Sequence, residues 1–192
     1  SIVNAERLDA NGIPYNYTAA VANPQSRLDI SPRFDFQLGK SNTLSVRYMY
    51  DRQKQTNSGV SQFALESQAY NVLNHENTLQ ISDTQVLSAN LINETRFQYT
   101  AARNSQAAQS SDATVTVQGS FTGGGNNQGT VRDNQDRFEL QDYVTASKGA
   151  HALNFGVRLR LTHESSYSTS GFNGNYTYSS LGAYAACTAS QY

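Results

Sequence analysis

A two-residue alternation of apolar and polar side chains constrains this chain more than any other feature. It is clearest in the C-terminal third, where Leu153, Phe155, Val157, Leu159 and Leu161 occupy every second position. The positions between them hold Asn, Gly, Arg and Thr. Because successive side chains of a strand point to opposite faces, such a segment has one apolar and one polar face. The pattern therefore predicts β-strands rather than helices, whose apolar residues would recur three and four positions apart.

The predicted strands come in pairs that are joined by short turns. We expect three hairpins: Arg27 to Asp51 around Gly39-Lys40-Ser41-Asn42, Thr78 to Thr100 around Ser88-Ala89-Asn90, and Asp136 to Glu164 around Ser147-Lys148-Gly149. Pro32 interrupts the apolar row of the first hairpin. Val86 falls out of phase with Leu79 and Ile81, which predicts a bulge or an early turn in the second.

Long polar segments separate the hairpins, and we expect them to be loops at 54–76 and 102–134. Residues 1–25 are expected to form an irregular loop or strand connection, and residues 26–192 a sheet segment that includes both loops. Within the loops, a short strand is expected at Thr114 to Gln118 and a flexible tip at the glycine-rich segment 123–129. We expect another strand to begin at Phe172 to Tyr178, and short helical turns at Tyr15 to Ala22 and Leu181 to Ala186.

Composition excludes several classes of protein. Hydrophobic residues make up 38% and charged residues 15% of the 192 residues, yet the net charge is only −1 and 10% are aromatic. A disordered chain would have a higher net charge and fewer aromatic residues, and a nucleic-acid-binding chain would be basic. No apolar run is long enough for a membrane-spanning helix, whereas a membrane β-strand needs only about 9–11 residues. Cys187 is the only cysteine, so the chain has no internal disulfide.

These observations predict an all-β fold: an antiparallel long-hairpin sheet that forms part of a transmembrane β-barrel. The predicted strands are about 10–14 residues long, against about 5–6 in globular proteins. Transmembrane barrels also have short periplasmic turns, long extracellular loops and a polar interior. The polar row that we expect to face the lumen consists of Arg27, Asp29, Arg33, Asp35, Arg47, Arg96, Arg158 and Arg160. The alternative is a secreted soluble β-sandwich or adhesin-type binding module, whose strands alternate in the same way.

Aromatic residues lie near several predicted strand ends. They are Tyr48, Tyr50, Phe97, Tyr99, Tyr143 and Tyr167. Such residues form girdles at the lipid headgroups in membrane barrels, but they also pack across strands in soluble sheets. Both interpretations stay open at this point.

Three segments resemble barrel segments of TonB-dependent outer-membrane receptors. They are NLINETRFQYT at 90–100, DRFELQDYVTASKGAHALNFGVRLR at 136–160 and GFNGNYTYSSLGAYAA at 171–186. The most similar branch is that of the Oar-like proteins with a carboxypeptidase-regulatory-like domain. Its Asn-Glu-x-x-Phe strand, Lys-Gly-x-His turn and Phe-Gly strand are matched in order by Asn93, Glu94 and Phe97, by Lys148, Gly149 and His151, and by Phe155 and Gly156. The resemblance extends from about Ser26 to the C-terminus.

The resemblance implies a barrel of about 22 strands in the bacterial outer membrane. Its partners would be outer-membrane lipid, the rest of the barrel, a plug domain, a TonB-type energy-coupling complex and an unknown solute that is taken up or bound at the surface. The chain contains neither a TonB-box-like segment nor a plug. Since it begins at Ser1 and ends at Tyr192 within an apolar-aromatic stretch, we expect it to be a fragment of a longer receptor. The family supplies no ligand-binding residues at these positions.

Nothing in the sequence predicts catalysis. His75, His151 and His163 stand apart without the spacing of metal ligands, so we expect no metal site, no cofactor and no enzymatic activity. A glycan-active enzyme would need two carboxylates that converge in a cleft. Asp29 and Asp35 share a strand face with Arg27 and Arg33, so charge compensation explains these carboxylates better than acid-base chemistry.

Overall fold

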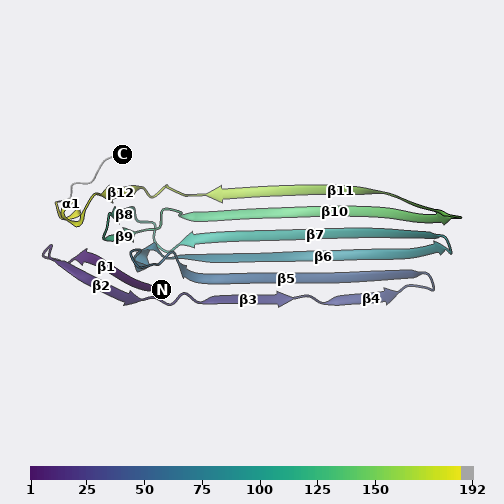
Figure 1. The fold of residues 1–192 in the computed structure, drawn as a ribbon, viewed down its shortest axis with the longest axis horizontal. Coiled ribbons are helices and arrows are strands. Elements are labelled where there is room, and N and C mark those ends of the chain that lie inside the picture. Colours follow the sequence, from purple (N-terminus) through teal and green to yellow (C-terminus); the bar gives the residue numbers. More distant parts are fainter. Residues whose placement is uncertain (187–192) are drawn as a thin grey trace.

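The computed structural model describes residues 1–186, and it combines one long antiparallel sheet with a small packed module at one end (Figure 1). Cys187 and Tyr192 lie outside the described residues. Among residues 1–186, no helix is long enough and apolar enough to cross a lipid bilayer.

The long sheet confirms the predicted all-β antiparallel fold. Its strands are β3 (Gln25–Ile30), β4 (Arg33–Gln37), β5 (Asn42–Ser58), β6 (Tyr70–Ser88), β7 (Leu91–Ala108), β10 (Thr130–Lys148) and β11 (His151–Ser168). They are ordered β11-β10-β7-β6-β5, with β3 and β4 both paired to the free side of β5. The strands β5, β6, β7, β10 and β11 have 17 to 19 residues each and are longer than expected.

The three predicted hairpins are present, and their turns lie together at one end of the sheet (Figure 1). The turn between β10 and β11 consists of Gly149 and Ala150 alone, because Lys148 pairs with His151. Gly149 has φ +58°, a conformation that two-residue hairpin turns favour and that glycine adopts without strain. The interruption at Pro32 separates β3 from β4, as expected for a residue that cannot donate a backbone hydrogen bond to a sheet.

The out-of-phase Val86 marks a bulge, as the sequence predicts. The register between β6 and β7 shifts between Val86 and Ser88, so Leu87 is the extra residue just before the turn. Leu79 and Ile81, which precede the bulge, keep a common face opposite Tyr99 and Phe97.

The predicted loops at 54–76 and 102–134 are too wide. The connections between the long strands cover only 59–69 and 109–129, because β5, β6, β7 and β10 continue into the polar segments on either side. Polar composition is a poor indicator of loops here, since the backbone makes the hydrogen bonds of the ladder and Asn, Gln and Thr side chains can face water from a strand. The polar residues Asp133, Asn134, Gln135 and Asp136 also lie within β10.

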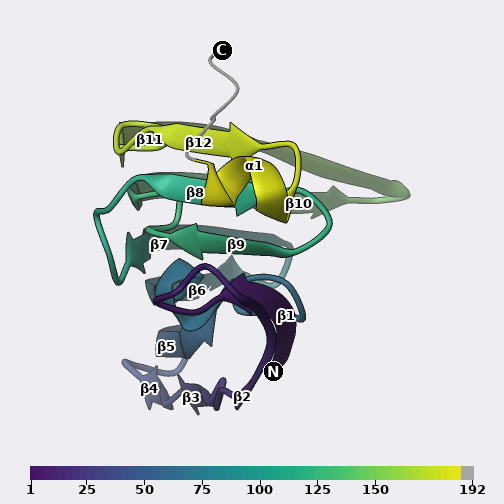
Figure 2. The ribbon, with the colours of Figure 1, turned by 90° about the vertical axis from the view of Figure 1, so that its left-hand side faces the viewer.

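A packed module occupies the end of the sheet opposite the turns (Figures 1 and 2). It comprises β1 (Ile2–Leu8), β2 (Pro14–Ala20), a 3-10 turn at Glu66–Gln68, β8 (Thr114–Val117), β9 (Phe121–Gly124), β12 (Asn175–Tyr178) and α1 (Leu181–Ala185). Its core consists of Val3, Ala5, Val60, Leu65, Ala69, Val117 and Phe121. The expected strand at Thr114 to Gln118 and the helical turn near Leu181 are therefore confirmed. The hydrophobic cluster of buried residues lies in this module, whereas the long sheet buries single side chains such as Ala101, Thr78 and Thr100.

Residues 1–25 are more regular than expected. The segment Tyr15 to Ala22 is not helical, because most of it forms β2, which pairs with β1 from Ile2 opposite Ala20 to Leu8 opposite Pro14. Asp9 closes this hairpin: its Oδ1 accepts hydrogen bonds from the backbone N–H groups of Asn11 and Ile13, both at 2.8 Å. The bond from Ile13 is the main reason that the pKa of Asp9 lies below its ordinary value.

The glycine-rich segment 123–129 is not a flexible tip. Gln68 reaches into it, and its Nε2 donates hydrogen bonds to the carbonyl oxygens of Gly123 and Gly125, both at 2.8 Å. Gly124 has φ +71°, and a Cβ atom there would lie 1.9 Å from the carbonyl oxygen of Ala113. The glycines allow close backbone packing within the module.

Candidate functional site

The register of the long sheet places all eight residues of the predicted polar row on one face. Residues that pair directly across two strands share a face, and faces alternate along each strand. The eight residues do not form a single row. Arg33, Arg47 and Arg160 belong to one cross-strand row, Asp35, Arg96 and Arg158 to the next row, and Arg27 and Asp29 to separate rows nearer the module. We call this surface the polar face.

The same register collects apolar side chains on the other surface, which we call the apolar face. It includes Leu153, Phe155, Val157, Leu159 and Leu161 of β11, together with their partners on neighbouring strands. These five side chains are between 53% and 65% exposed. Within residues 1–186, no second sheet packs on this face. The sheet thus presents two chemically opposite surfaces.

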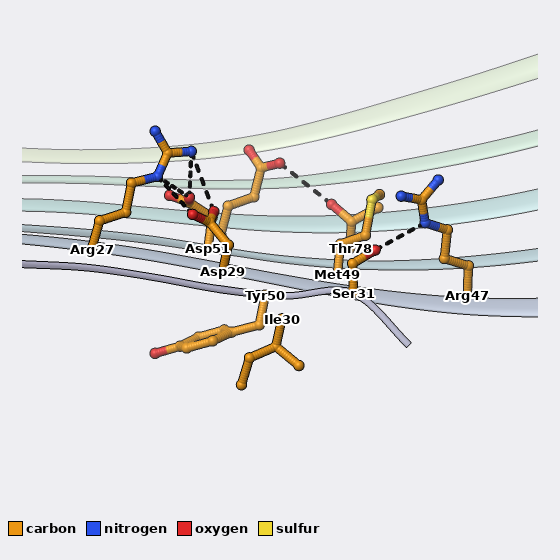
Figure 3. Close-up of a pocket in the computed structure, with 10 residues that line it drawn as sticks. Arg27, Asp29, Ile30, Ser31, Arg47, Met49, Tyr50, Asp51 and Thr78 are labelled. Carbon is orange, nitrogen blue, oxygen red and sulfur yellow. Dashed lines mark hydrogen bonds and ion pairs between the residues drawn. The ribbon is translucent and has the colours of Figure 1, made fainter. Parts of the chain in front are cut away.

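A carboxylate cluster occupies the polar face near the module (Figure 3). Arg27 forms ion pairs with Asp29 (Nε to Oδ2, 3.0 Å) and with Asp51 (Nη2 to Oδ2, 2.9 Å). Figure 3 shows these groups on one side of the strands and Tyr50 and Ile30 on the other. The cluster lines a hollow of about 400 Å³.

Asp29, Asp51 and Glu76 lie in one cross-strand row, which Gln135 and Glu164 continue beyond Ala102. This row is nearer the module than the row of Arg33, Arg47 and Arg160. On the described strands of the polar face, carboxylates therefore outnumber arginines toward the module, and arginines outnumber carboxylates toward the turns.

The arginines of the polar face are held by hydrogen bonds and ion pairs. Glu139 binds two of them, Arg158 (Nη2 to Oε1, 2.6 Å) and Arg160 (Nε to Oε2, 2.9 Å). Arg33 pairs with Asp35 at 3.0 Å, and Arg96 pairs with Glu94 at 2.9 Å. The Nε of Arg47 donates to Ser31 Oγ at 3.1 Å. Exposed ion pairs of this kind add little stability, so they mainly give the face a hydrated, fixed charge pattern.

Sequence reasoning missed several members of this network. Asp51, Glu76, Glu94, Arg137 and Glu139 share the polar face with the predicted residues, and their strand parity alone would have identified them. What the sequence could not indicate is the pairing between strands. The ion pair between Arg137 and Glu76, at 3.6 Å, joins β10 to β6 across the intervening β7.

The aromatic residues divide between the two faces. Tyr48, Tyr50, Phe97 and Tyr99 belong to the apolar face, as a girdle requires. Tyr167, opposite Arg132, is on the same face. Tyr143 does not belong to this set, because it pairs with Gly156 on the polar face. A Cβ atom on Gly156 would lie 2.5 Å from Cδ1 of Tyr143, so the ring packs against this glycine.

A second hollow, of about 360 Å³, lies where β7, β10 and β11 meet the module. Its lining has no ionisable side chain: Ala108, Ser110, Ser111, Asn126, Gly129, Thr130, Thr169, Phe172 and Asn173. The ring of Phe172 is 90% exposed. This combination of hydroxyl and amide groups with an open aromatic ring suits an uncharged polar solute.

The histidines do not form a site. His75 and His163 lie on the apolar face, and His151 directly follows the turn at Gly149. Within the described part of the chain, no three His, Cys, Asp or Glu side chains are grouped so that they could hold a metal ion.

The module contains one further polar contact between distant segments. The hydroxyl of Tyr17 donates to Oε1 of Glu66 at 2.6 Å. This hydrogen bond is the main cause of the raised pKa of Tyr17, because ionised Tyr17 would lose the bond and face the carboxylate.

Comparison with protein families provides the assignment. The family described as outer membrane beta barrel domain matches residues 3–191. The comparison with curated proteins and the comparison with solved structures gave no match. The match confirms the barrel class of the fold, contact with membrane lipid and location in the bacterial outer membrane. Together with the two-faced sheet of long antiparallel strands, it shows that the chain belongs to the outer-membrane β-barrel domain family.

Proposed function

We propose that the chain is a non-enzymatic wall segment of a TonB-dependent receptor barrel of the Oar-like branch, which takes up or binds a solute at the cell surface. The observation that carries the proposal is the sheet with two opposite faces and a packed module at one end only. In this arrangement the apolar face contacts lipid, and the polar face lines the lumen. The turns lie on the periplasmic side and the module on the external side, as in other membrane barrels.

The polar face suits a lumen that surrounds a plug domain. Paired arginines and carboxylates keep the wall hydrated, and they offer hydrogen-bonding partners to a second polar surface without leaving an isolated charge. The row with Asp29, Asp51 and Glu76 lies toward the external side. A solute that enters from outside would meet these carboxylates, with Arg27 beside them, before the rows in which arginines outnumber carboxylates.

The module supports the receptor part of the proposal. Long external loops of barrels often carry binding function, and these loops have their own core with Leu65 and Phe121. The hollow beside Phe172 would take an uncharged, hydroxyl-bearing solute. Thr130, the first residue of β10, and Thr169, which directly follows β11, both line it.

Residues that resemble the receptor family lie in the long hairpins and are held by specific contacts. Asn93 Nδ2 donates to Asp142 Oδ1 at 2.9 Å, and Phe97 pairs with Leu140 on the apolar face. Phe155 and Gly156 lie on opposite faces of β11. These contacts are those of barrel-wall residues.

The alternative is a secreted soluble β-sandwich or adhesin module. A sandwich covers the apolar face of each sheet with a second sheet about 10 Å away. In residues 1–186 the apolar face of β11 remains uncovered, and this observation favours the membrane barrel.

Binding of the native protein to the periplasmic domain of an energy-coupling protein of the TonB type tests the receptor class. The native protein would be extracted from outer membranes with detergent and passed over the immobilised domain. We expect specific retention, and folded protein should migrate differently before and after heating on a denaturing gel. A folded outer-membrane protein that the coupling domain does not retain would contradict the receptor class but not the barrel. Recovery in the soluble fraction without a heat-dependent mobility change would contradict both.

A further inference from the structure

The apolar face changes its chemistry toward the module. One cross-strand row contains Tyr48, Leu79, Tyr99, Phe138 and Leu161. The row after next contains Arg52, His75, Arg103, Asn134 and Ser165, and the following row contains Lys54, Leu73, Ser105, Arg132 and Tyr167. Within about four residues along each strand, which is roughly 13 Å, the face passes from aromatic and aliphatic to basic.

We call Arg52, Lys54, Arg103 and Arg132 the basic margin. Its only carboxylate neighbour on this face is Asp136, among the strands that the structure describes, and Asp136 already pairs with Arg103 at 2.7 Å. In residues 1–186, no carboxylate oxygen lies within 4.0 Å of a side-chain nitrogen of Arg52, Lys54 or Arg132. Lys54 and Arg132 are exposed, and Arg52 is partly exposed. The margin therefore has unpaired positive charge.

The opposite end of the same face carries more carboxylates than cations. Asp83 and Asp142 lie in one row toward the turns, and the strand cation on this face there, within the described residues, is Lys148 at the last position of β10. On the described strands of the polar face, by contrast, every arginine except Arg47 pairs with a carboxylate. The basic margin is thus not a consequence of overall composition, since the net charge of the chain is −1.

Tyrosine hydroxyls lie at the boundary between the apolar rows and the basic margin. Tyr48 donates to Asn77 Oδ1 at 2.6 Å, and Tyr99 donates to Asp136 Oδ1 at 2.7 Å. Tyrosine prefers this boundary in membrane proteins because its ring is apolar and its hydroxyl is hydrated. The basic margin then begins at the depth of the lipid headgroups.

We propose that Arg52, Lys54, Arg103 and Arg132 bind phosphate groups of lipid headgroups in the leaflet on the module side. The inference rests on the proposed orientation, in which the apolar face contacts lipid. Arginine and lysine donate charge-assisted hydrogen bonds to phosphate oxygens. Arg52 and Lys54 on β5 and Arg132 on β10 provide donors without a carboxylate partner, and Arg103 on β7 adds a guanidinium that already pairs with Asp136. A phosphorylated lipid would neutralise the three charges that the described chain leaves unpaired.

Binding of lipid A in two forms tests this inference. Native protein in neutral detergent would be titrated with diphosphorylated lipid A and with the same lipid after enzymatic removal of both phosphates, and bound lipid would be counted by native mass spectrometry. We expect the diphosphorylated form to bind at least about tenfold more tightly, which two or more cation-phosphate contacts would produce. Equal binding of the two forms would overturn the proposal without the use of any variant.

Variants show which residues bind the diphosphorylated lipid. Arg52→Gln/Lys54→Gln is expected to lose about tenfold in affinity for the diphosphorylated lipid, and adding Arg132→Gln should lower it further. The matched control is Lys40→Gln/Lys148→Gln, which removes two cations at the turn end and should leave the affinity unchanged. Arg52→Lys/Arg132→Lys keeps the charges and should retain most of the binding.

The outcomes separate the two proposals. Wild-type affinity in Arg52→Gln/Lys54→Gln, with a normal heat-dependent mobility change, would overturn the lipid site and leave the barrel orientation intact. Displacement of the lipid by inorganic phosphate at equal concentration would identify a site for free phosphate. This outcome would also overturn the lipid site. If the protein carried no bound lipid of any kind and stayed soluble without detergent, the orientation itself would be wrong.

Discussion

At the scale of single residues, glycine positions constrain the sheet more tightly than its ion pairs. The ion pairs of the polar face are largely exposed, and removing one would change stability little. Gly156 is different, because a Cβ atom there would lie 2.2 Å from the backbone carbonyl oxygen of Asp142 and 2.5 Å from the ring of Tyr143. The backbone of β10 cannot move away without loss of the ladder between β10 and β11.

Gly156→Ala is therefore expected to destabilise the β10–β11 pair by about 1–3 kcal/mol, in the range of overpacked sites. The heating temperature at which the native protein loses its folded mobility on a denaturing gel measures this effect. Tyr143→Ala/Gly156→Ala should stay destabilised, since the carbonyl contact remains. If the double variant regained wild-type stability, the ring and not the backbone would be the obstacle.

At the scale of elements, the hairpin of β10 and β11 shows how one strand suits lipid on its apolar face and water on its polar face. Leu159 pairs with Leu140 on the apolar face, and the next residue, Arg160, pairs with Glu139 on the polar face. A shift of one residue in register would exchange these environments for every side chain of β11. Apolar burial in lipid and ion pairing in water thus specify the same register.

Leu159→Arg is expected to impair assembly of the native protein, because an arginine that faces hydrocarbon costs about 2–4 kcal/mol near the middle of a bilayer. The fraction with folded, heat-modifiable mobility in the outer membrane would report assembly. Arg160→Gln is the matched control on the polar face, and it should assemble normally since Glu139 keeps its partner Arg158 at 2.6 Å. Equal assembly of the two variants would show that the face of β11 with Leu159 does not contact hydrocarbon.

At the scale of the whole molecule, the long sheet has two open edges within the described residues. β11 forms one edge and β3 with β4 the other. A sheet cannot leave such edges unpaired in lipid, because every backbone N–H and C=O group must be bonded there. The barrel therefore needs partner strands for both edges.

The 192-residue chain, diluted from denaturant into aqueous buffer without detergent, is expected to aggregate. Its open edges and the uncovered apolar face, including Phe155 at 60% exposure, would pair with other copies. Analytical ultracentrifugation in the absence and presence of detergent micelles measures the outcome, and the micelles should reduce aggregation by covering the apolar face. A soluble monomer with a cooperative thermal transition in plain buffer would instead favour the β-sandwich alternative.

The sequence by itself determined which side chains share a face. Strand parity is a local property of the backbone, so the alternation around Phe155 and Arg158 assigned both residues before any strand partner was known. The strand interruption at Pro32 and the bulge at Val86 could also be predicted from the sequence, because each has a local cause.

The tertiary structure alone decided the partners. The row of Asp29, Asp51 and Glu76 and the basic margin exist because the register aligns separate strands, and no local pattern specifies that alignment. The end module depends on it even more, since its core joins Val3, Leu65 and Phe121. Such contacts form only once the ladder has brought distant segments together, and for this reason the loop boundaries and the β1–β2 hairpin could not be predicted from the sequence.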